Sequence, residues 1–250
     1  MLHLENISVS FNQQMTLKKK VIDGLNLTLD SGDFMHVLGH NGAGKSTLLN
    51  LIAGLIIPDE GEVILDGKKM TSLSVEARAE WIGQVFQNPQ DGTCAALTVE
   101  ENMALGWMRG QPKNLKKALG RKARQLFQEL LSDLGMGLEN VLYQPMGLLS
   151  GGQRQAIQLL IATLKPPKIL LLDEHTAALD PIATEMILAL TDKLVKKYQL
   201  TVVMITHRLV DALNYGNKII LMQQGRIKAL FNQQEKEALT PEMLLYQFNT

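Results

Sequence analysis

One stretch constrains the fold more than the rest of the chain: Gly39-His40-Asn41-Gly42-Ala43-Gly44-Lys45-Ser46-Thr47. It matches G-x-x-x-x-G-K-[ST], a loop that holds phosphate groups between a strand and a helix. The apolar run 34–38 before it is typical of a buried strand, and apolar residues after it recur at helical spacing: Leu48, Leu49, Leu51, Ile52 and Leu55. The pattern therefore predicts a nucleotide site at a strand–loop–helix junction.

The residue types in this loop suit a triphosphate. Its glycines let backbone N–H groups approach the anion because no Cβ intervenes, and the following helix directs its positive dipole end at the same place. We expect Lys45 to reach the β- and γ-phosphates, Ser46 to bind Mg²⁺ and Thr47 to lie near the α-phosphate. A glycine-rich turn that happens to precede Lys-Ser is the weaker interpretation, given the flanking strand and helix.

Length and composition limit the class of protein. A chain of 250 residues is long enough for one large domain or for a core with an inserted subdomain. Acidic and basic residues balance at 25 each, so no overall field favours nucleic acid or an anionic membrane. The single cysteine, Cys94, excludes a disulfide within the chain and fits a reducing cytosol. We interpret Cys94 as a small packing residue rather than a nucleophile.

Two membrane-related signals are missing from the sequence. The N-terminal residues show no basic region followed by an apolar one, as a secretory signal would. The longest apolar candidate, 157–172, is interrupted by Lys165-Pro166-Pro167-Lys168 and falls short of the roughly 20 residues that a spanning helix needs. We therefore expect that the chain does not cross a membrane by itself.

The N-terminal part of the chain predicts an antiparallel layer. Residues 2–11 and 21–29 alternate between apolar and polar types, as strands exposed on one face do. The segment 12–20 between them is polar and is expected to be a solvated loop that contains Lys18, Lys19 and Lys20. Residues 61–67 form a further strand that ends in an Asp-Gly turn.

The next part predicts an inserted helical region. Residues 81–87 form an apolar strand that ends on Gln87, and Thr98-Val99-Glu100-Glu101 matches a capping box at a helix start. Residues 113–134 form a long amphipathic stretch, with these leucines expected to face inward: Leu115, Leu119, Leu126, Leu130 and Leu134. Its basic residues predict a solvated face or, less favoured, a contact with a partner or lipid headgroups: Lys113, Lys116, Lys117, Arg121, Lys122 and Arg124.

Strands and helices then alternate. Residues 169–173 and 201–206 are buried strands, Asp180-Pro181 opens a helix to about residue 198, and 218–222 with 226–230 form a hairpin around Gln224-Gly225. Residues 240–245 predict a short closing helix. The fold class is therefore α/β: a P-loop core with a mixed sheet, an antiparallel β subdomain and an inserted α-helical subdomain. We assign 1–89 and 156–230 to the core with its β subdomain, 90–155 to the helical subdomain and 231–250 to a tail.

A second candidate anion site precedes another helix: Leu149-Ser150-Gly151-Gly152-Gln153. A hydroxyl, two glycines and a helix N-terminus suit a phosphate. One chain rarely needs two cradles for one nucleotide, so the simplest use is to close over a nucleotide held by another copy. An ordinary Ser-Gly-Gly helix start is the alternative.

The order of these motifs resembles the ABC (ATP-binding cassette) ATPase family. The phosphate loop is followed by Gln87, by the Leu149–Gln153 signature, by a buried strand ending in Asp173-Glu174, by Ala178-Leu179-Asp180 and by His207. The resemblance extends from Phe11 through His207 to the hairpin, over nearly the whole chain.

The resemblance implies a role for each matching residue. Asp173 corresponds to the aspartate that holds Mg²⁺, and Glu174 to the general base that activates the attacking water. Gln87 corresponds to a glutamine that touches Mg²⁺ or that water, and His207 to a switch histidine at the γ-phosphate. Phe11 corresponds to the aromatic residue that stacks on adenine, although a core phenylalanine remains the alternative.

Two departures from the family pattern stand out. His175 and Ala177 replace the common proline and serine after Asp-Glu; we interpret His175 as a neutral packing residue, with tuning of the loop or of its pH response as the alternative. Asp180 resembles the family's dimer-contact aspartate and is also placed to cap a helix. The segment 141–147 lacks the Thr-Glu-Val-Gly pattern that exporters often carry, and no membrane helices are fused to the chain, which favours an importer cassette.

The resemblance implies an ATPase that uses ATP and Mg²⁺. Two copies would enclose two nucleotides and drive a separate membrane permease for uptake of a small solute, together with a solute-binding protein, at the cytoplasmic face of the cell membrane. No nucleic-acid partner is expected. The alternative is an ATPase of the same family that works on DNA, on ribosomes or in cofactor assembly.

Overall fold

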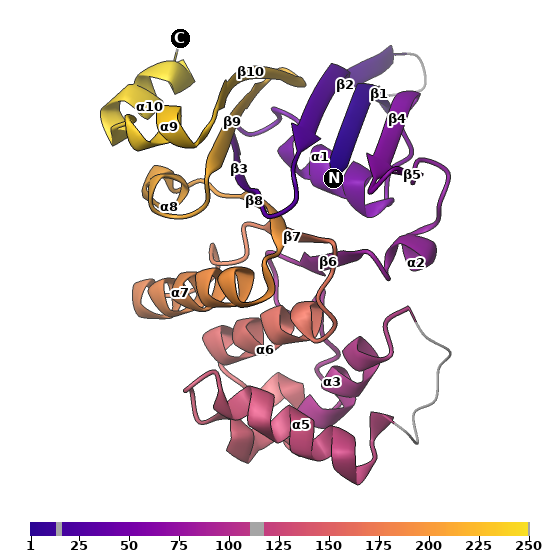
Figure 1. The fold of residues 1–250 in the computed structure, drawn as a ribbon, viewed down its shortest axis with the longest axis vertical. Helices are drawn as coiled ribbons and strands as arrows, with labels where there is room; N and C mark the ends of the chain where they lie inside the picture. The colour runs from indigo at the N-terminus through magenta and orange to yellow at the C-terminus, as the bar shows by residue number, and fades with distance from the viewer. Residues whose placement is uncertain (14–16, 111–117, 250) are drawn as a thin grey trace. The chain divides into compact units, whose positions relative to one another are not determined.

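The computed structural model describes residues 1–13, 17–110 and 118–249. The chain divides into two compact units (Figure 1): residues 1–78 with 200–250 form the first, and residues 79–199 form the second. The predicted helical insertion 90–155 falls within the second unit.

The first unit contains an antiparallel sheet with the strand order β2-β1-β4-β5. Its strands are β1 (Leu2–Gln13), β2 (Leu17–Leu29), β4 (Glu60–Leu65) and β5 (Lys68–Lys69). Leu2 of β1 lies opposite Leu29 of β2 and Leu65 of β4, and all three side chains are buried. Asp66 and Gly67 turn between β4 and β5 with φ of 50° and 75°. This confirms the predicted antiparallel layer and its Asp-Gly turn.

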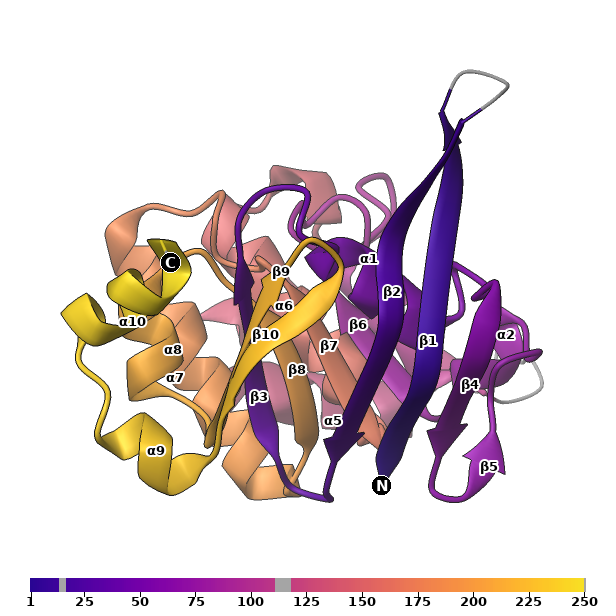
Figure 2. The same cartoon turned by 90° about the horizontal axis from the view of Figure 1, so that it is seen from above.

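The hairpin of β1 and β2 is longer than predicted. The sequence predicts a loop over 12–20, but β1 continues to Gln13 and β2 begins at Leu17, so Lys18, Lys19 and Lys20 lie in a strand. Figure 2 shows the two strands side by side along their length. The three lysines are exposed, as expected, but backbone pairing continues past the buried part of the sheet. No hydrophobic alternation marks such an extension in the sequence.

A second group of strands positions the phosphate loop. In it, β3 (Phe34–Gly39) pairs in parallel with β8 (Thr201–Ile205) and with β9 (Lys218–Gln223). Every residue of β3 is buried, as is typical of a parallel strand in a sheet that is covered on both faces. The strand β10 (Arg226–Phe231) pairs with β9 through a turn in which Gln224 and Gly225 have φ of 48° and 79°. The predicted hairpin is confirmed.

Helices complete the first unit. α1 (Lys45–Ala53) follows the phosphate loop. The other described helices of this unit are α2 (Val75–Arg78), α8 (Leu209–Asn214), α9 (Gln233–Glu237) and α10 (Pro241–Asn249). Leu244 of α10 is buried in a cluster with Leu38 of β3 and Leu221 of β9. The tail therefore packs against the strand that carries the phosphate loop.

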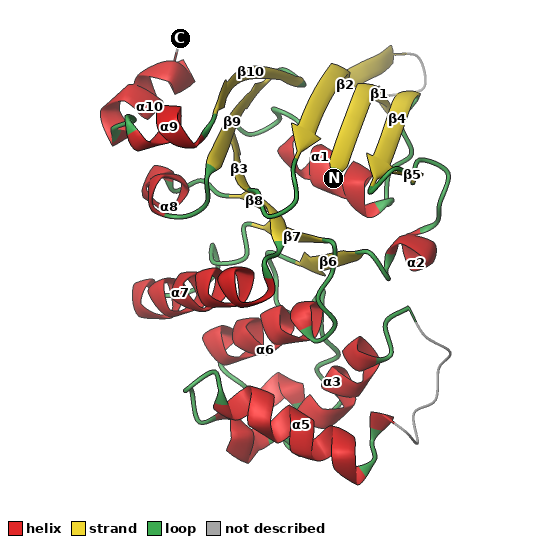
Figure 3. Cartoon of the chain, viewed as in Figure 1, coloured by secondary structure: helices red, strands yellow, loops and turns green. Residues whose placement is uncertain are grey.

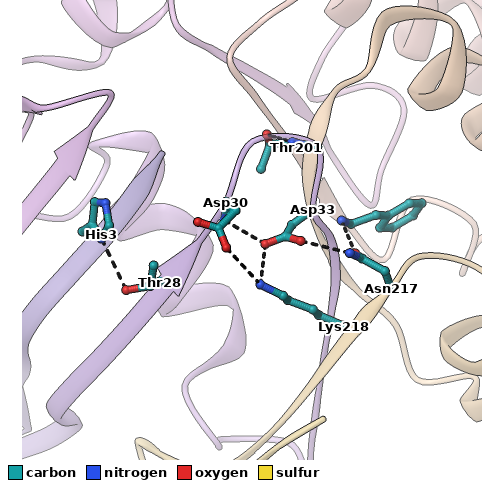
Figure 4. A network of polar contacts seen from close by, with 9 residues as sticks. His3, Thr28, Asp30, Asp33, Thr201, Asn217 and Lys218 are labelled. Atoms are coloured by element: carbon teal, nitrogen blue, oxygen red, sulfur yellow. Dashed lines mark hydrogen bonds and ion pairs between the residues drawn. The ribbon is translucent and has the colours of Figure 1, made fainter. Parts of the chain in front are cut away.

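A polar network secures the start of β3 (Figure 4). Asp33 accepts hydrogen bonds from the Lys218 ammonium at 2.6 Å and from the Asn217 amide at 2.9 Å. The amide oxygen of Asn217 accepts in turn from the backbone N–H of Phe34 at 2.7 Å. Burial raises the pKa of Asp33, but the bonds from Lys218 and Asn217 outweigh it and lower that pKa overall. The carboxylate thus ties the start of β3 to the start of β9.

The second unit is mainly helical (Figure 3). Among its described residues, the strands β6 (Ile82–Val85) and β7 (Ile169–Asp173) pair in parallel. Its helices are α3 (Val99–Trp107), α5 (Arg121–Ser132), α6 (Gly151–Thr163) and α7 (Pro181–Tyr198), with 3₁₀ turns at Leu138–Val141 and Met146–Leu148. Thr98 and Glu101 form the predicted capping box at the start of α3.

The buried stripe of α5 differs from the prediction. Ala123, Phe127 and Leu131 are buried, whereas Leu126 and Leu130 are only half-buried. The true stripe follows the i, i+4 row centred on the larger Phe127, whose ring lies edge-on to Trp107 at 6.0 Å. Among the predicted residues, Leu119 and Leu134 are also half-buried, and Leu115, Lys113, Lys116 and Lys117 lie outside the described residues.

Two smaller expectations have different outcomes. Cys94 is exposed, so its interpretation as a packing residue is wrong. Within residues 1–13, 17–110 and 118–249, no helix has the length and apolar character needed to cross a membrane.

Candidate functional site

The backbone of the phosphate loop can be made only with glycine at two positions. A Cβ at Gly39 would lie 2.5 Å from the Met222 carbonyl oxygen of β9, and one at Gly44 would lie 2.9 Å from the Val21 carbonyl oxygen of β2. Gly42 and Gly44 also have φ of 81° and 100°, which L side chains rarely adopt. The loop is therefore pressed against two strands, and its open side has no side chain at these positions.

The charged groups of the loop suit a bound phosphate. Lys45 is buried, and its ammonium donates to the carbonyl oxygens of Gly39 at 2.8 Å and His40 at 3.2 Å. α1 begins at Lys45 with Gly44 as its N-cap, so the first amides of the helix have no side-chain cap. Ser46 is exposed and Thr47 is half-buried. A buried ammonium beside an uncapped helix N-terminus fits a polyphosphate.

The structure brings His207 together with the phosphate loop. A pocket of about 520 Å³ opens beside the loop in the first unit. Its lining comes from the end of β3 and the loop, from the turn after β8, from the start of α8 and from α10: Leu38, Gly39, His40, Asn41, Thr206, His207, Leu209, Leu245 and Phe248. His207 is exposed, and the N–H of Arg208 donates to the Thr206 hydroxyl at 3.1 Å in the turn that carries it. The predicted sensor and the predicted cradle thus line one cavity.

The C-terminal helix contributes residues that the sequence did not indicate. The Phe248 ring packs edge-on against the His40 ring at 4.8 Å, and the His40 Nε2 atom lies 3.3 Å from the Phe248 carbonyl oxygen. The sequence predicted a short closing helix here but carried no signal for its contact with the loop. Leu244 and Phe248 are spaced i, i+4, which could have indicated only that they share a helix face.

Phe11 lies near the end of β1 opposite Lys19, and its side chain is 42% exposed. The core-phenylalanine alternative is therefore wrong. Phe11 is not among the residues that line the pocket at His207. Stacking on adenine stays a prediction for this exposed ring.

In the second unit, the predicted catalytic residues follow two neighbouring strands. Asp173 is the last residue of β7, Glu174 comes next, and Gln87 follows the end of β6. β6 and β7 are parallel, with Val85 opposite Leu172, so these polar residues emerge at the same edge. Asp173 and Glu174 are half-buried and Gln87 is exposed. Glu174 has φ of 44°, a sparsely populated conformation for a residue with a side chain.

The signature residues form the start of α6. Ser150 is its N-cap: the hydroxyl accepts from the N–H of Gln153 at 3.3 Å, and the Gln153 side chain accepts from the N–H of Ser150 at 3.1 Å. A Cβ at Gly152 would lie 3.1 Å from the Cβ of Ala183 in α7, so this glycine permits close helix packing. Gly151 and Ser150 are exposed. These residues therefore form a helix start, as the ordinary interpretation says, and the N-terminus of α6 is accessible.

The residues after Glu174 have clear local roles. Asp180 caps α7, because its carboxylate accepts from the N–H of Ala183 at 2.9 Å. His175 is buried, and burial lowers its pKa to about 4, so the ring is neutral at physiological pH. This agrees with a neutral packing residue. Ala177 is exposed.

The candidate metal ligands are all oxygen donors. The Ser46 hydroxyl, the Asp173 carboxylate and the Gln87 amide suit Mg²⁺, which prefers oxygen and usually keeps few protein ligands beside phosphates and water. Among the described residues, no group of three or more His, Cys, Asp and Glu side chains could hold a metal ion by itself.

Known proteins resemble this chain along nearly its full length. Residues 22–177 match the protein family described as ABC transporter. The tyrosine transport ATP-binding protein of Clostridioides difficile is 40% identical over 248 residues, which cover 99% of this chain and 98% of that protein. The energy-coupling factor transporter ATP-binding protein EcfA1 of Streptococcus thermophilus is 32% identical over 235 residues, covering 94% of this chain and 81% of that protein.

Solved structures of ATP-binding cassettes have the same fold. The cassette MJ0796, in a dimeric post-hydrolysis state bound to ADP and Pi, has a TM-score of 0.78 and 30% identity, covering 93% of this chain and 99% of that one. The cbiO1 protein of Clostridium perfringens, part of the transporter complex cbiONQ, has a TM-score of 0.78 and 25% identity, covering 99% of this chain and 94% of that one.

Proposed function

The chain belongs to the ABC transporter family as an ATP-binding ATPase subunit, and we propose that two copies of it close around two Mg·ATP to drive solute uptake through a separate permease. One observation carries this proposal: the same chain presents two helix N-termini suited to phosphate. α1 follows the Gly39–Thr47 loop, and α6 begins at the exposed Ser150 and Gly151. Each nucleotide would lie between the loop of one copy and the α6 N-terminus of the other.

The residues divide the work by their chemistry. The loop amides and the Lys45 ammonium bind the phosphates, and the exposed Phe11 ring stacks on adenine. Mg²⁺, held by Ser46, Asp173 and Gln87, would supply neutralisation of the phosphate charge. Glu174 takes a proton from the attacking water or orients it.

The remaining parts serve opening and closing. His207 contacts the γ-phosphate and so distinguishes ATP from ADP, because only ATP carries that group. Gln87, two residues after the end of β6, links the phosphates to the helical segment that follows it in the chain. ATP binding closes the pair of subunits, and hydrolysis reopens it, as in other nucleotide-driven domain closures.

The proposed partners are a second copy, an integral membrane permease and a solute-binding protein, at the cytoplasmic face of the cell membrane. Cargo is selected by the permease and the solute-binding protein rather than by this chain. The 40% identity to a tyrosine transport subunit makes tyrosine the first cargo to test.

Copurification tests the transport proposal against the alternative. The tagged chain, expressed in its own host and extracted in mild detergent, should retain an integral membrane protein, and the ATPase rate of the complex should respond to its cargo. The Lys45→Ala variant is the matched control, because it should copurify without hydrolysing ATP. ATPase stimulation by DNA or ribosomes without any permease would contradict the proposal and favour the alternative function.

A further inference from the structure

The turn that carries Glu174 has an unusual backbone. Glu174 follows β7 directly and has φ of 44°, while its carbonyl oxygen accepts from the N–H of Ala177 at 2.9 Å. For a residue with a Cβ this conformation is disfavoured, so neighbouring contacts must hold it. The residue next to Glu174 is His175, whose side chain is 1% exposed.

The His175 ring is joined to α7 by a hydrogen bond with a defined direction. Its Nε2 atom lies 3.1 Å from the hydroxyl of Thr191. That hydroxyl donates its own proton to the Ile187 carbonyl oxygen at 2.7 Å, so toward the ring it acts as an acceptor. His175 must therefore carry its proton on Nε2. Among the described residues its Nδ1 atom has no hydrogen-bond partner.

A second contact joins the same turn to the same helix face. The Thr184 hydroxyl donates to the carbonyl oxygen of Thr176 at 3.4 Å. Thr184 and Thr191 are seven residues apart, which places them on one face of α7 two turns apart, and both are buried. Consecutive residues of the turn are thus fixed at two points on one rigid helix.

We propose that His175 is a positioning residue for Glu174, and that its bond to Thr191 holds the carboxylate in the orientation required for hydrolysis. The inference rests on the proposed role of Glu174. A proline at position 175 would restrict the backbone through its ring. In this chain a buried side chain anchored to α7 performs that restriction, so hydrolysis depends on the hydroxyl of Thr191, a residue outside the nucleotide motifs.

The test compares steady-state hydrolysis and urea unfolding of His175→Ala, His175→Gln, Thr191→Val and the double variant His175→Ala/Thr191→Val. Thr191→Val keeps the side-chain volume and removes the acceptor. His175→Gln keeps a donor near the position of Nε2. Thr163→Val is the matched control: Thr163 is a buried threonine that donates to its own helix, at the Leu159 carbonyl oxygen.

We expect His175→Ala and Thr191→Val each to lower kcat roughly 10- to 100-fold with KM for ATP unchanged, because the base is displaced while nucleotide binding is intact. The double variant should be no slower than the slower single variant, since both remove one bond. His175→Gln should restore most of kcat, and Thr163→Val should lower stability without lowering kcat.

The inference is overturned if His175→Ala and Thr191→Val keep kcat within about twofold of the parent while losing stability as Thr163→Val does. Additive losses in the double variant would overturn it as well. If His175→Ala does not fold, the volume-matched Thr191→Val variant decides. The Glu174→Gln variant distinguishes failure of the proposed function from failure of this inference. An unchanged kcat in Glu174→Gln refutes the role of Glu174 as the base. If Glu174→Gln loses kcat but the substitutions at His175 and Thr191 leave kcat unchanged, only the positioning role of His175 is refuted.

Discussion

Replacing Arg78 by methionine should destabilise the first unit strongly, although Arg78 belongs to none of the nucleotide motifs. Its side chain is 1% exposed. The guanidinium donates to the carbonyl oxygens of Leu51 at 2.9 Å and Ile52 at 2.8 Å, near the C-terminus of α1, and to those of Thr71 at 3.1 Å and Leu73 at 3.2 Å. Burial lowers the pKa of Arg78, yet the group stays charged at neutral pH.

The magnitude follows from the two bonds that end at buried oxygens, those of Leu51 and Ile52. A hydrogen bond from a charged donor contributes about 1.5–3 kcal/mol, so two contribute about 3–6 kcal/mol. Removing a buried charge also removes its desolvation cost, which offsets part of the loss. We therefore expect Arg78→Met to lower the free energy of unfolding by about 3 kcal/mol. Water can reach the partly buried oxygens of Thr71 and Leu73, so their bonds are left out.

Urea unfolding followed by circular dichroism measures this change, with the slope m checked for constancy. Gly54→Ala provides an independent arm, because a Cβ there would lie 2.7 Å from the Nε atom of Arg78. Gly54→Ala should cost less in the Arg78→Met background than in the parent, although the positive φ of Gly54 keeps some cost in both. A loss below about 1 kcal/mol for Arg78→Met would refute the reasoning, since that is no more than one ordinary hydrogen bond.

Three further predictions concern single side chains. Lys45→Ala should weaken binding of a fluorescent ATP analogue roughly 50-fold by loss of charge-assisted bonds, and unchanged affinity would mean that Lys45 is misassigned. Phe11→Ala should weaken binding of the same analogue roughly tenfold, while Phe11→Trp preserves it. Equal affinity of the Phe11→Ala and Phe11→Trp variants would exclude stacking. Burial raises the pKa of Asp33 but the bonds from Lys218 and Asn217 lower it overall, so its contribution to stability should be complete above the ordinary value of 3.8 and lost as pH falls through the lower folded value. In urea unfolding between pH 6 and pH 3, the Asp33→Asn variant should lack this loss of stability at acid pH. Parallel pH profiles of the free energy of unfolding for the variant and the parent would contradict the prediction.

Local signals were sufficient for much of the fold. The Asp66-Gly67 and Gln224-Gly225 turns follow from residue types that accept positive φ, and the capping box at Thr98 follows from spacing within one turn of helix. In each case, a few neighbouring residues contain all the information that the prediction needs. The polar ends of β6 and β7 could likewise be predicted, because parallel strands place their carboxyl ends at one edge.

Contacts between distant residues could not be predicted in the same way. His40 and Phe248 meet because α10, 208 residues later in the chain, returns to the phosphate loop, and His175 meets Thr191 because the turn after β7 packs against α7. Periodicity says which face of a helix is apolar but not which polar group it meets. For α5 the leucine pattern indicates a face one residue away from the buried one, because the buried stripe is centred on the larger Phe127.

The central claim is that each nucleotide needs two copies of the chain, and light scattering after size exclusion tests it most directly. Glu174→Gln removes the proposed base while leaving the phosphate loop and the α6 N-terminus intact. With Mg·ATP this variant should elute as a dimer retaining one ATP per chain, and adding Ser150→Arg, which places a bulky cation at the α6 N-terminus, should return it to a monomer. A Glu174→Gln variant that stays monomeric with saturating ATP would contradict the account.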